Sequence, residues 1–200
     1  MWCDTGYILR FNANLTVTDS GPNSLASLSQ NVSFTTSGYR SHAISFNQNT
    51  SYFQINRLTG LGITNKHFSI SLWIWPHSLS GTLLYMKDSG ATLFWCLSFL
   101  EFAAKGSVVA QIWIGTLRTI FDPVLSTTSN WHDIVQTWSQ SNGLRLYVNN
   151  NLVGTDASAT SYVTSAMSNL PTDPSTYVHK EPLYLHFHTV VTLMMSAYSL

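Results

Sequence analysis

The sequence predicts an all-β protein, a sandwich of antiparallel strands. Short apolar and β-branched segments are separated by turn signals roughly every ten residues, which is the spacing typical of a sandwich or barrel. Several segments alternate apolar and polar residues with a period of two, as strands with one buried face do. No stretch has a long 3.6-residue period, so long helices are not expected.

In the first third of the chain, strands are expected at Tyr7–Phe11, Ala43–Asn47 and Tyr52–Ile55. Residues 24–42 form a Ser/Thr/Asn-rich meander with scattered apolar positions, for which we predict no strand. Residues 57–65, with two glycines, are predicted to be a loop.

Phe68–Trp75 is the strongest predicted strand. One face carries four large apolar residues, and the other carries two serines and two tryptophans: Phe68, Ile70, Leu72 and Ile74 against Ser69, Ser71, Trp73 and Trp75. Pro76 lacks an N–H for the ladder and is predicted to end the strand. Further strands are predicted at Thr82–Met86, Phe94–Phe102, Ser107–Ile114 and Leu117–Phe121, with a break at Asp122-Pro123.

The segment from Trp131 to Thr155 predicts two consecutive hairpins. His132–Ser139 is followed by a turn that ends at Gly143, because Asn and Gly tolerate positive φ angles. Leu144–Val148 then alternates strictly, which predicts that Leu144, Leu146 and Val148 are buried and that Arg145 and Tyr147 are more exposed. Asn149-Asn150 forms the second turn, and Leu152-Val153 begins the return strand.

These segments resemble a laminin-G-like domain of the concanavalin A-like lectin/glucanase superfamily. The late part of the pattern is carried by Trp131, Ile134, Val135, Gly143, Leu144, Leu146, Tyr147, Val148, Asn149, Leu152 and Val153. Two earlier matches are Phe68–Pro76 and, more loosely, Ala43–Asn47. The resemblance covers roughly Tyr7 to Tyr162 and implies a concanavalin A-like jelly-roll β-sandwich.

The chain departs from this pattern in three places. Asp133 stands where the family usually has His, and Asn150 replaces a Gly. No closing strand of the family type is found, so the sandwich is expected to lack it and to leave Tyr7–Phe11 with an open edge.

Composition favours an extracellular β-protein. The chain is 44% hydrophobic and 13% aromatic but only 9% charged, so its surface polarity must come from Ser, Thr, Asn and Gln. The net charge is zero and no basic run is present, which argues against nucleic acid as a partner. The first residues do not form a signal peptide, so an extracellular domain would be part of a larger protein.

Two cysteines and three sequons are present. Cys96, between Trp95 and Leu97, is expected to be a reduced core residue, although a bridge to Cys3 stays open. Asn14, Asn31 and Asn49 each begin an N-x-S/T sequon and are glycosylation candidates if the chain is secreted.

No catalytic machinery is recognisable. Glycoside hydrolysis normally needs two facing carboxylates, yet the only glutamates, Glu101 and Glu181, have no acidic neighbour within four positions. The related glucanases carry E-x-D-x-E on one strand, and that motif is missing. The adjacent His132 and Asp133 would point to opposite faces of a strand. We therefore expect no enzyme activity.

Metal and ligand candidates are few. Many laminin-G-like domains bind calcium, and the resemblance makes Asp19 the candidate ligand here. His186 and His188 are two residues apart, so they would share one face of a strand and could hold a transition metal, although such a pair is usually incidental. Among the seven tryptophans, Trp73, Trp131 and Trp138 are expected in the core, and Trp95 and Trp113 are nominated as exposed ligand-binding aromatics.

The sequence divides into a domain over residues 1–170 and an atypical tail over 171–200. Three prolines in residues 171–182 predict a linker. The apolar segment 183–200 contains two histidines and is barely long enough for a membrane span, which makes insertion unfavourable. Its alternation at Leu183, Leu185 and Phe187 leaves open that it substitutes for the missing strand.

By resemblance, the chain is expected to be a non-catalytic module that binds a glycan or an extracellular protein. A glycosidase-related domain without recognisable catalytic carboxylates and a truncated fragment without independent function are the alternatives.

Overall fold

The fold is a sandwich of two seven-stranded antiparallel sheets, with a separate two-stranded sheet at one end. The structure of the chain is a computed structural model. It describes residues 9–11, 17–19, 26–36, 38–39, 43–46, 48, 50–55, 61, 63–76, 79–88, 96–103, 105–125, 130–163, 174–178 and 189–192. The predicted all-β, concanavalin A-like architecture is confirmed.

Sheet I has the strand order β11-β10-β9-β8-β15-β6-β3, and sheet II has the order β14-β13-β12-β7-β16-β5-β4. The strands of sheet I are β3 (Ser27–Gln30), β6 (Tyr52–Ile55), β8 (Gly81–Asp88), β9 (Cys96–Phe102), β10 (Ser107–Trp113), β11 (Leu117–Val124) and β15 (Pro174–Val178). Those of sheet II are β4 (Val32–Thr35), β5 (Ala43–Phe46), β7 (Phe68–Pro76), β12 (His132–Ser139), β13 (Gly143–Val148), β14 (Asn151–Asp156) and β16 (Thr189–Thr192).

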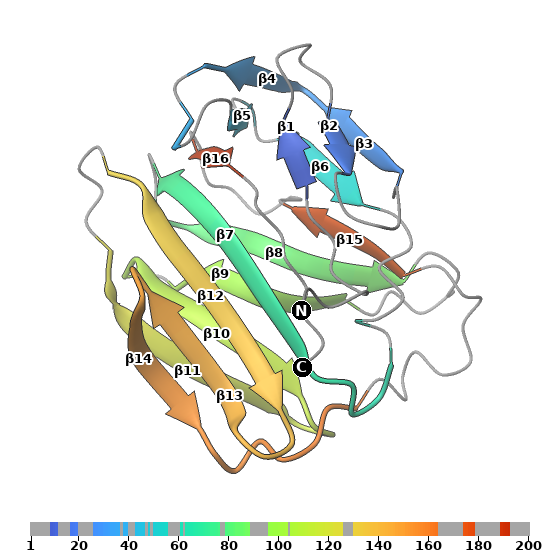
Figure 1. Cartoon of the computed structure of the whole chain (residues 1–200), viewed down its shortest axis with the longest axis vertical. Coiled ribbons are helices and arrows are strands. Elements are labelled where there is room, and N and C mark those ends of the chain that lie inside the picture. The colour runs from blue at the N-terminus through green and yellow to red at the C-terminus, as the bar shows by residue number, and fades with distance from the viewer. Residues whose placement is uncertain are drawn as a thin grey trace, which may run out of the picture.

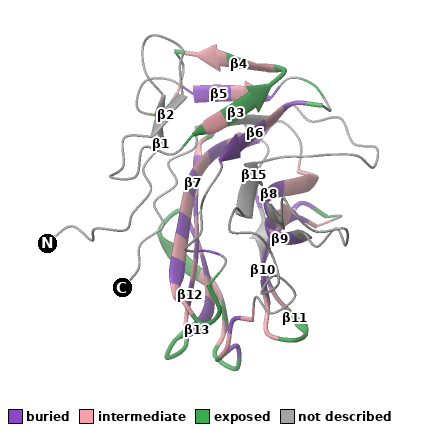
Figure 2. Ribbon diagram, turned by 90° about the vertical axis from the view of Figure 1, so that its right-hand side faces the viewer, coloured by how far each residue is buried: buried purple, intermediate pink, exposed green. Residues whose placement is uncertain are grey.

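The core lies between the inner faces of the two sheets, where the buried residues gather in Figure 2. The apolar face of β7 is buried as predicted, with Phe68, Ile70, Leu72 and Ile74 at most 4% exposed. Leu144, Leu146 and Val148 are also buried, whereas Arg145 and Tyr147 are half-exposed, which confirms the predicted faces of β13. Trp138 is buried among them, and its indole N–H donates to the carbonyl oxygen of Ala159 over 2.7 Å.

The meander predicted for residues 24–42 contains two strands, so that prediction is wrong. β3 pairs with β6 in sheet I, and β4 pairs with β5 in sheet II. Asn31, with a φ angle of 51°, turns the chain from one sheet to the other. Both strands are outermost in their sheets. β3 is largely exposed and β4 is mostly half-buried, and each is only four residues long, so they give little sequence signal.

The break predicted at Asp122-Pro123 is also wrong, because β11 continues through it to Val124. The register between β10 and β11 shifts there: Val109 pairs with Phe121, and Ser107 pairs with Val124. A bulge on an outermost strand tolerates proline, since no ladder donor is needed at that position.

The tail differs most from its prediction. Pro174–Val178 is not a linker but strand β15, which pairs with β6 and β8. Proline is acceptable as the first residue of a strand, and Thr-Tyr-Val are favourable strand residues. Within the apolar segment 183–200, Thr189–Thr192 forms β16 between β5 and β7. Sequence reasoning missed both because neither strand carries an alternating pattern.

Strand β1 (Leu9–Phe11) is paired on one side, and among the described residues no strand pairs with its other edge, so the structure does not contradict the expected open edge. It forms a small sheet with β2 (Val17–Asp19), in which Leu9 is opposite Asp19. Figure 1 shows β1–β6 together at one end of the molecule and the long strands β7–β14 at the other. β15 and β16 lie between these two groups, one in each sheet.

Candidate functional site

The outer face of sheet II, which points away from the core, carries the candidate site. Alternation along β7 puts Trp73 and Trp75 on this face, opposite the buried apolar set. Trp131, just before β12, is half-buried beside them. The expectation that Trp73 and Trp131 are core residues is therefore wrong, although Trp138 is buried as expected. The period of two already contained this information, because Trp73 shares its face with Ser69 and Ser71.

Four aromatic rings meet on this face, and we call Tyr39, Trp73, Trp75 and Trp131 the aromatic platform. The rings of Tyr39 and Trp73 are stacked, with their centroids 3.6 Å apart and an interplanar angle of 13°. Trp131 makes edge-to-face contacts with Tyr39 at 6.5 Å and with Trp75 at 5.7 Å. Such contacts fix ring orientations more firmly than apolar burial alone.

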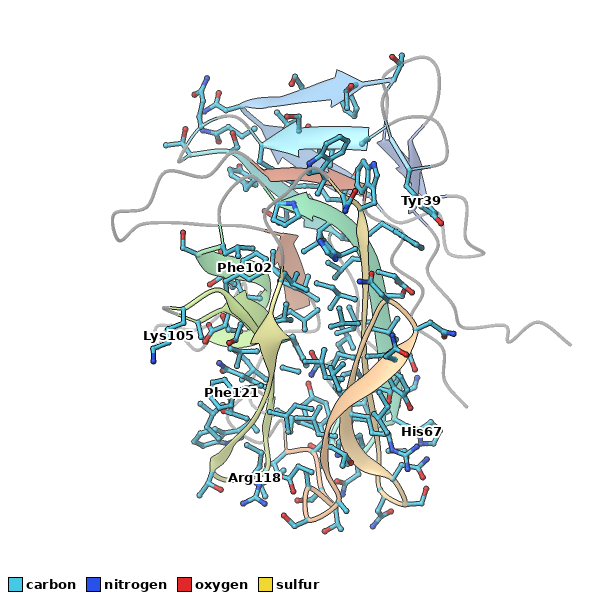
Figure 3. The ribbon with its side chains drawn as sticks, turned by 90° about the vertical axis from the view of Figure 1, so that its left-hand side faces the viewer. Tyr39, His67, Phe102, Lys105, Arg118 and Phe121 are labelled. Carbon is cyan, nitrogen blue, oxygen red and sulfur yellow. The ribbon has the colours of Figure 1, made fainter. Side chains whose placement is uncertain are left out.

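Tyr39 is the outermost ring of the platform. It comes from the connection between β4 and β5 and is 44% exposed. Figure 3 shows it on the outer side of sheet II, at the same surface as His67. One face of its ring lies against Trp73, so its exposed area belongs to the opposite face and the edges. No sequence pattern pointed to Tyr39, because a Ser-Gly-Tyr-Arg connection does not reveal which strand it will contact.

Asp133 lies next to the platform on the same face, directly across from Trp73 in the pairing of β12 with β7. Partial burial raises the pKa of its carboxyl group, while a hydrogen bond from Ser71 opposes the rise. Its Oδ1 atom is shielded from solvent and has no hydrogen-bond partner. Its backbone is held by Asn149, whose Oδ1 accepts from the Asp133 N–H over 3.1 Å and whose own N–H donates to the Asp133 carbonyl over 2.8 Å.

This arrangement is suited to binding rather than to acid–base catalysis. The aromatic rings offer apolar faces to a ligand, and the carboxylate of Asp133 offers a hydrogen-bond acceptor. Glu101, the other carboxylate considered above, lies in sheet I and accepts a hydrogen bond from Gln111 Nε2 over 2.6 Å. Glu101 and Asp133 therefore belong to different sheets and do not face each other across one ligand, as hydrolysis would require.

Two of the sequence-based site residues, Trp113 and Asn31, have described side chains, and neither belongs to the platform. Trp113, on β10, is half-buried and packs against the core from sheet I. Asn31 is exposed, and its side-chain amide donates to Thr50 Oγ1 over 2.8 Å. Asp19 is the last residue of β2, but its side chain lies outside the described residues, as do Trp95, Asn14, Asn49, Cys3, the Cys96 side chain, Glu181, His186 and His188.

In the part of the chain that the structure describes, no group of three or more His, Cys, Asp or Glu side chains is close enough to hold a metal ion. The same residues include no helix with the length and apolar character needed to cross a membrane.

Comparison with solved structures finds toxin binding domains with a similar fold. The binding domain of Paraclostridial Mosquitocidal Protein 1 is 14% identical with a TM-score of 0.67, and the match covers 96% of this chain and 48% of that one. The botulinum neurotoxin serotype G binding domain is 12% identical with a TM-score of 0.67, covering 98% and 47%. The botulinum neurotoxin DC binding domain in complex with SialylT is 10% identical with a TM-score of 0.60, covering 98% and 48%.

The chain thus spans about half the length of these binding domains. At such low identity, the likeness establishes the fold alone. No match was found among curated proteins. A family model described as the concanavalin A-like lectin/glucanases superfamily matches residues 46–176, from the end of β5 into β15. This match covers well over half of the chain, and the chain therefore belongs to the concanavalin A-like lectin/glucanase superfamily.

Proposed function

We propose that this chain is a non-catalytic, extracellular carbohydrate-binding module that uses the aromatic platform on sheet II. The observation that carries the proposal is the stack of Tyr39 on Trp73, which presents an oriented and partly exposed ring at the surface. Sugar rings have apolar C–H faces that lie flat on Tyr and Trp rings, while their hydroxyl groups need polar partners such as Asp133. The toxin relatives support a binding role, and one of them is seen with SialylT.

Binding is tested on a glycan array probed with the purified chain, with and without calcium. Tyr39→Ala is the informative variant, because this exposed side chain contributes little to the core and its removal should leave the fold intact. We expect it to weaken glycan binding about tenfold or more without changing the melting temperature substantially. Absence of glycan binding by the wild-type chain, or full binding by a folded Tyr39→Ala variant, would refute the platform.

Trp113 is the matched control for the site. Trp95 and Trp113 remain the sequence-based proposal for ligand contacts, and Trp113 belongs to sheet I rather than to the platform. Loss of binding in Trp113→Ala, with Tyr39→Ala unaffected, would move the site to sheet I.

Calcium at Asp19 is likewise a proposal, and it predicts that Asp19→Asn abolishes any calcium dependence seen on the array.

The same preparation tests the absence of hydrolase activity. We expect no reducing sugar to be released from β-glucans or galactans, because the sequence places no acidic residue within four positions of Glu101. Release that disappears in Glu101→Gln would contradict this expectation.

An extracellular protein is the second proposed partner class, and binding to a protein receptor without any glycan binding would favour it. Glycosylation at Asn31 would accompany secretion into a glycosylating compartment.

A further inference from the structure

The outer face of sheet II continues beyond the aromatic platform. Strand pairing lines up Ser71, Val135, Tyr147 and Leu152 in one row across β7, β12, β13 and β14. This row lies two residues along the strands from the pair formed by Trp73 and Asp133. Two residues along a strand and two strand spacings across the sheet put Tyr147 about 12 Å from Trp73.

The floor between Trp73 and Tyr147 is made of short side chains. Ser71 and Val135 occupy the intervening positions and are only partly buried. The strand register therefore separates the two aromatic side chains by positions that carry shorter side chains. Leu152, next to Tyr147 on the outermost strand, is 52% exposed and extends the apolar surface at that end.

Two shielded polar atoms without partners flank this row. Asp133, which carries the unpartnered Oδ1, is two residues from Val135, the residue opposite Tyr147. Arg145, which carries the unpartnered Nε, is two residues from Tyr147 and lies on the other side of the row. Among the residues that the structure describes, the only other such atom is Gln136 Oε1, which is in the core. Each atom is closed to solvent, so a ligand on this face meets the partly buried side chains that carry these atoms, Asp133 and Arg145, rather than the atoms themselves.

The two flanking side chains differ in chemistry. The Asp133 carboxylate accepts hydrogen bonds and the Arg145 guanidinium donates them, and the two carry opposite charges. Sugar hydroxyl groups both donate and accept, so one class of neutral ligand can serve both side chains. A ligand of net negative or net positive charge would suit one side of the row and be repelled by the other.

We propose that Tyr147 forms a second ring-stacking position and that the module takes a linear, neutral oligosaccharide lying across β7, β12 and β13. This inference rests on the proposed function, since the first sugar is stacked at the platform. It adds that recognition extends over several rings of a chain rather than being confined to one terminal sugar.

The test measures affinity against ring number. Linear neutral gluco-, xylo- and galacto-oligosaccharides of one to six rings are titrated by calorimetry into the wild type and into three variants. For the wild type, the affinity should rise until both aromatic positions are filled. Tyr147→Ala should lose about tenfold on the longer chains and nothing on the shortest, whereas Tyr147→Phe should keep the wild-type profile. Tyr39→Ala should weaken every length.

The outcomes separate this inference from the function on which it rests. Platform-dependent binding that does not change with ring number leaves the proposed function standing and overturns the second position. Equal loss at all lengths in Tyr147→Ala also overturns it, because that result reveals a purely structural role for Tyr147. Failure of the wild type to bind any of these chains, with binding only to sialylated probes, overturns the neutral-chain inference alone. Failure to bind any glycan overturns both.

Discussion

Arg118 and Asp156 form a two-point ion pair that connects the outermost strands of the two sheets, β11 and β14. The guanidinium Nε donates to Oδ2 over 2.8 Å, and Nη2 donates to Oδ1 over 3.1 Å. Ser158 donates to the same carboxylate through its N–H and its hydroxyl group. Figure 3 shows Arg118 at the end of the sandwich where these strands meet. The pair therefore joins the sheets where no hydrogen-bonded ladder does.

This pair makes stability depend on acid. Hydrogen bonds from Arg118 and Ser158 lower the pKa of Asp156 to about 2, from an ordinary value of 3.8. A carboxylate with a lowered folded-state pKa stabilises the fold above its unfolded pKa, and this contribution disappears as the pH falls from about 4 through about 2. Asp156→Asn should therefore lower the melting temperature near neutral pH and have little effect at about pH 2. Equal losses at both pH values would contradict the ion-pair explanation.

The faces of β13 can be tested by a matched pair of substitutions. Leu146 is fully buried, so Leu146→Ala should cost about 2–5 kcal/mol of unfolding free energy. Its neighbour Arg145 is on the outer face, and Arg145→Ala should cost far less. Chemical denaturation of both variants measures the difference, and equal shifts of the midpoint would refute this assignment of faces.

Alanine substitutions at Gly143 and Gly115 distinguish steric crowding from backbone strain. Both have positive φ angles, 69° and 98°, which disfavour any side chain by about 1–3 kcal/mol. A Cβ at Gly143 would also lie 2.1 Å from the Asp156 carbonyl oxygen, whereas one at Gly115 would meet nothing within 4 Å. Gly143→Ala should therefore lower the melting temperature clearly more than Gly115→Ala does. Similar losses would mean that the turn before β13 adjusts to make room.

Asp133 should affect stability in the direction opposite to Asp156. Burial raises the pKa of its carboxyl group, so the folded state favours the protonated form. The fold thus gains stability as the pH falls through this raised value, and the gain is complete below the unfolded pKa. Asp133→Asn should be at least as stable as the wild type near neutral pH, with an advantage that shrinks on acidification. An advantage that grows on acidification would reverse the sign of the shift.

The tail is predicted to be part of the sandwich. β15 and β16 each have a paired strand on both sides, so their amides should resist hydrogen exchange in the full chain. Deleting residues 171–200 should lower the melting temperature and raise exchange in β5 to β8. Unchanged melting of residues 1–170 would instead support the predicted division at residue 170, which stays open until this comparison is made.

The sequence predicts a strand well where its alternation of apolar and polar residues matches the alternation of buried and exposed side chains. β7, β12 and β13 alternate along their length, and their inner faces are buried accordingly. β3 and β16 carry no such pattern, because an exposed outermost strand and a short inserted strand are defined by their neighbours. The same reason applies to the platform: Trp73 could be placed on the outer face from alternation, but the contact with Tyr39 depends on where a distant connection lies.

The order in which the strands are synthesised differs from the order in which they lie in the two sheets. In the part of the chain that the structure describes, strands β3 to β6 are connected by backbone hydrogen bonds to β7 and β8 only through β15 and β16, which are synthesised after the other strands of the two sheets. Until then, β5, β6, β7 and β8 present unpaired backbone groups, the kind of edge that promotes association between chains. The nascent polypeptide can form its β7–β14 portion early, but it must wait for the last strands to complete both sheets. Such distant pairing makes folding slow, and a newly made chain therefore passes through an aggregation-prone interval in which chaperones would be of most use.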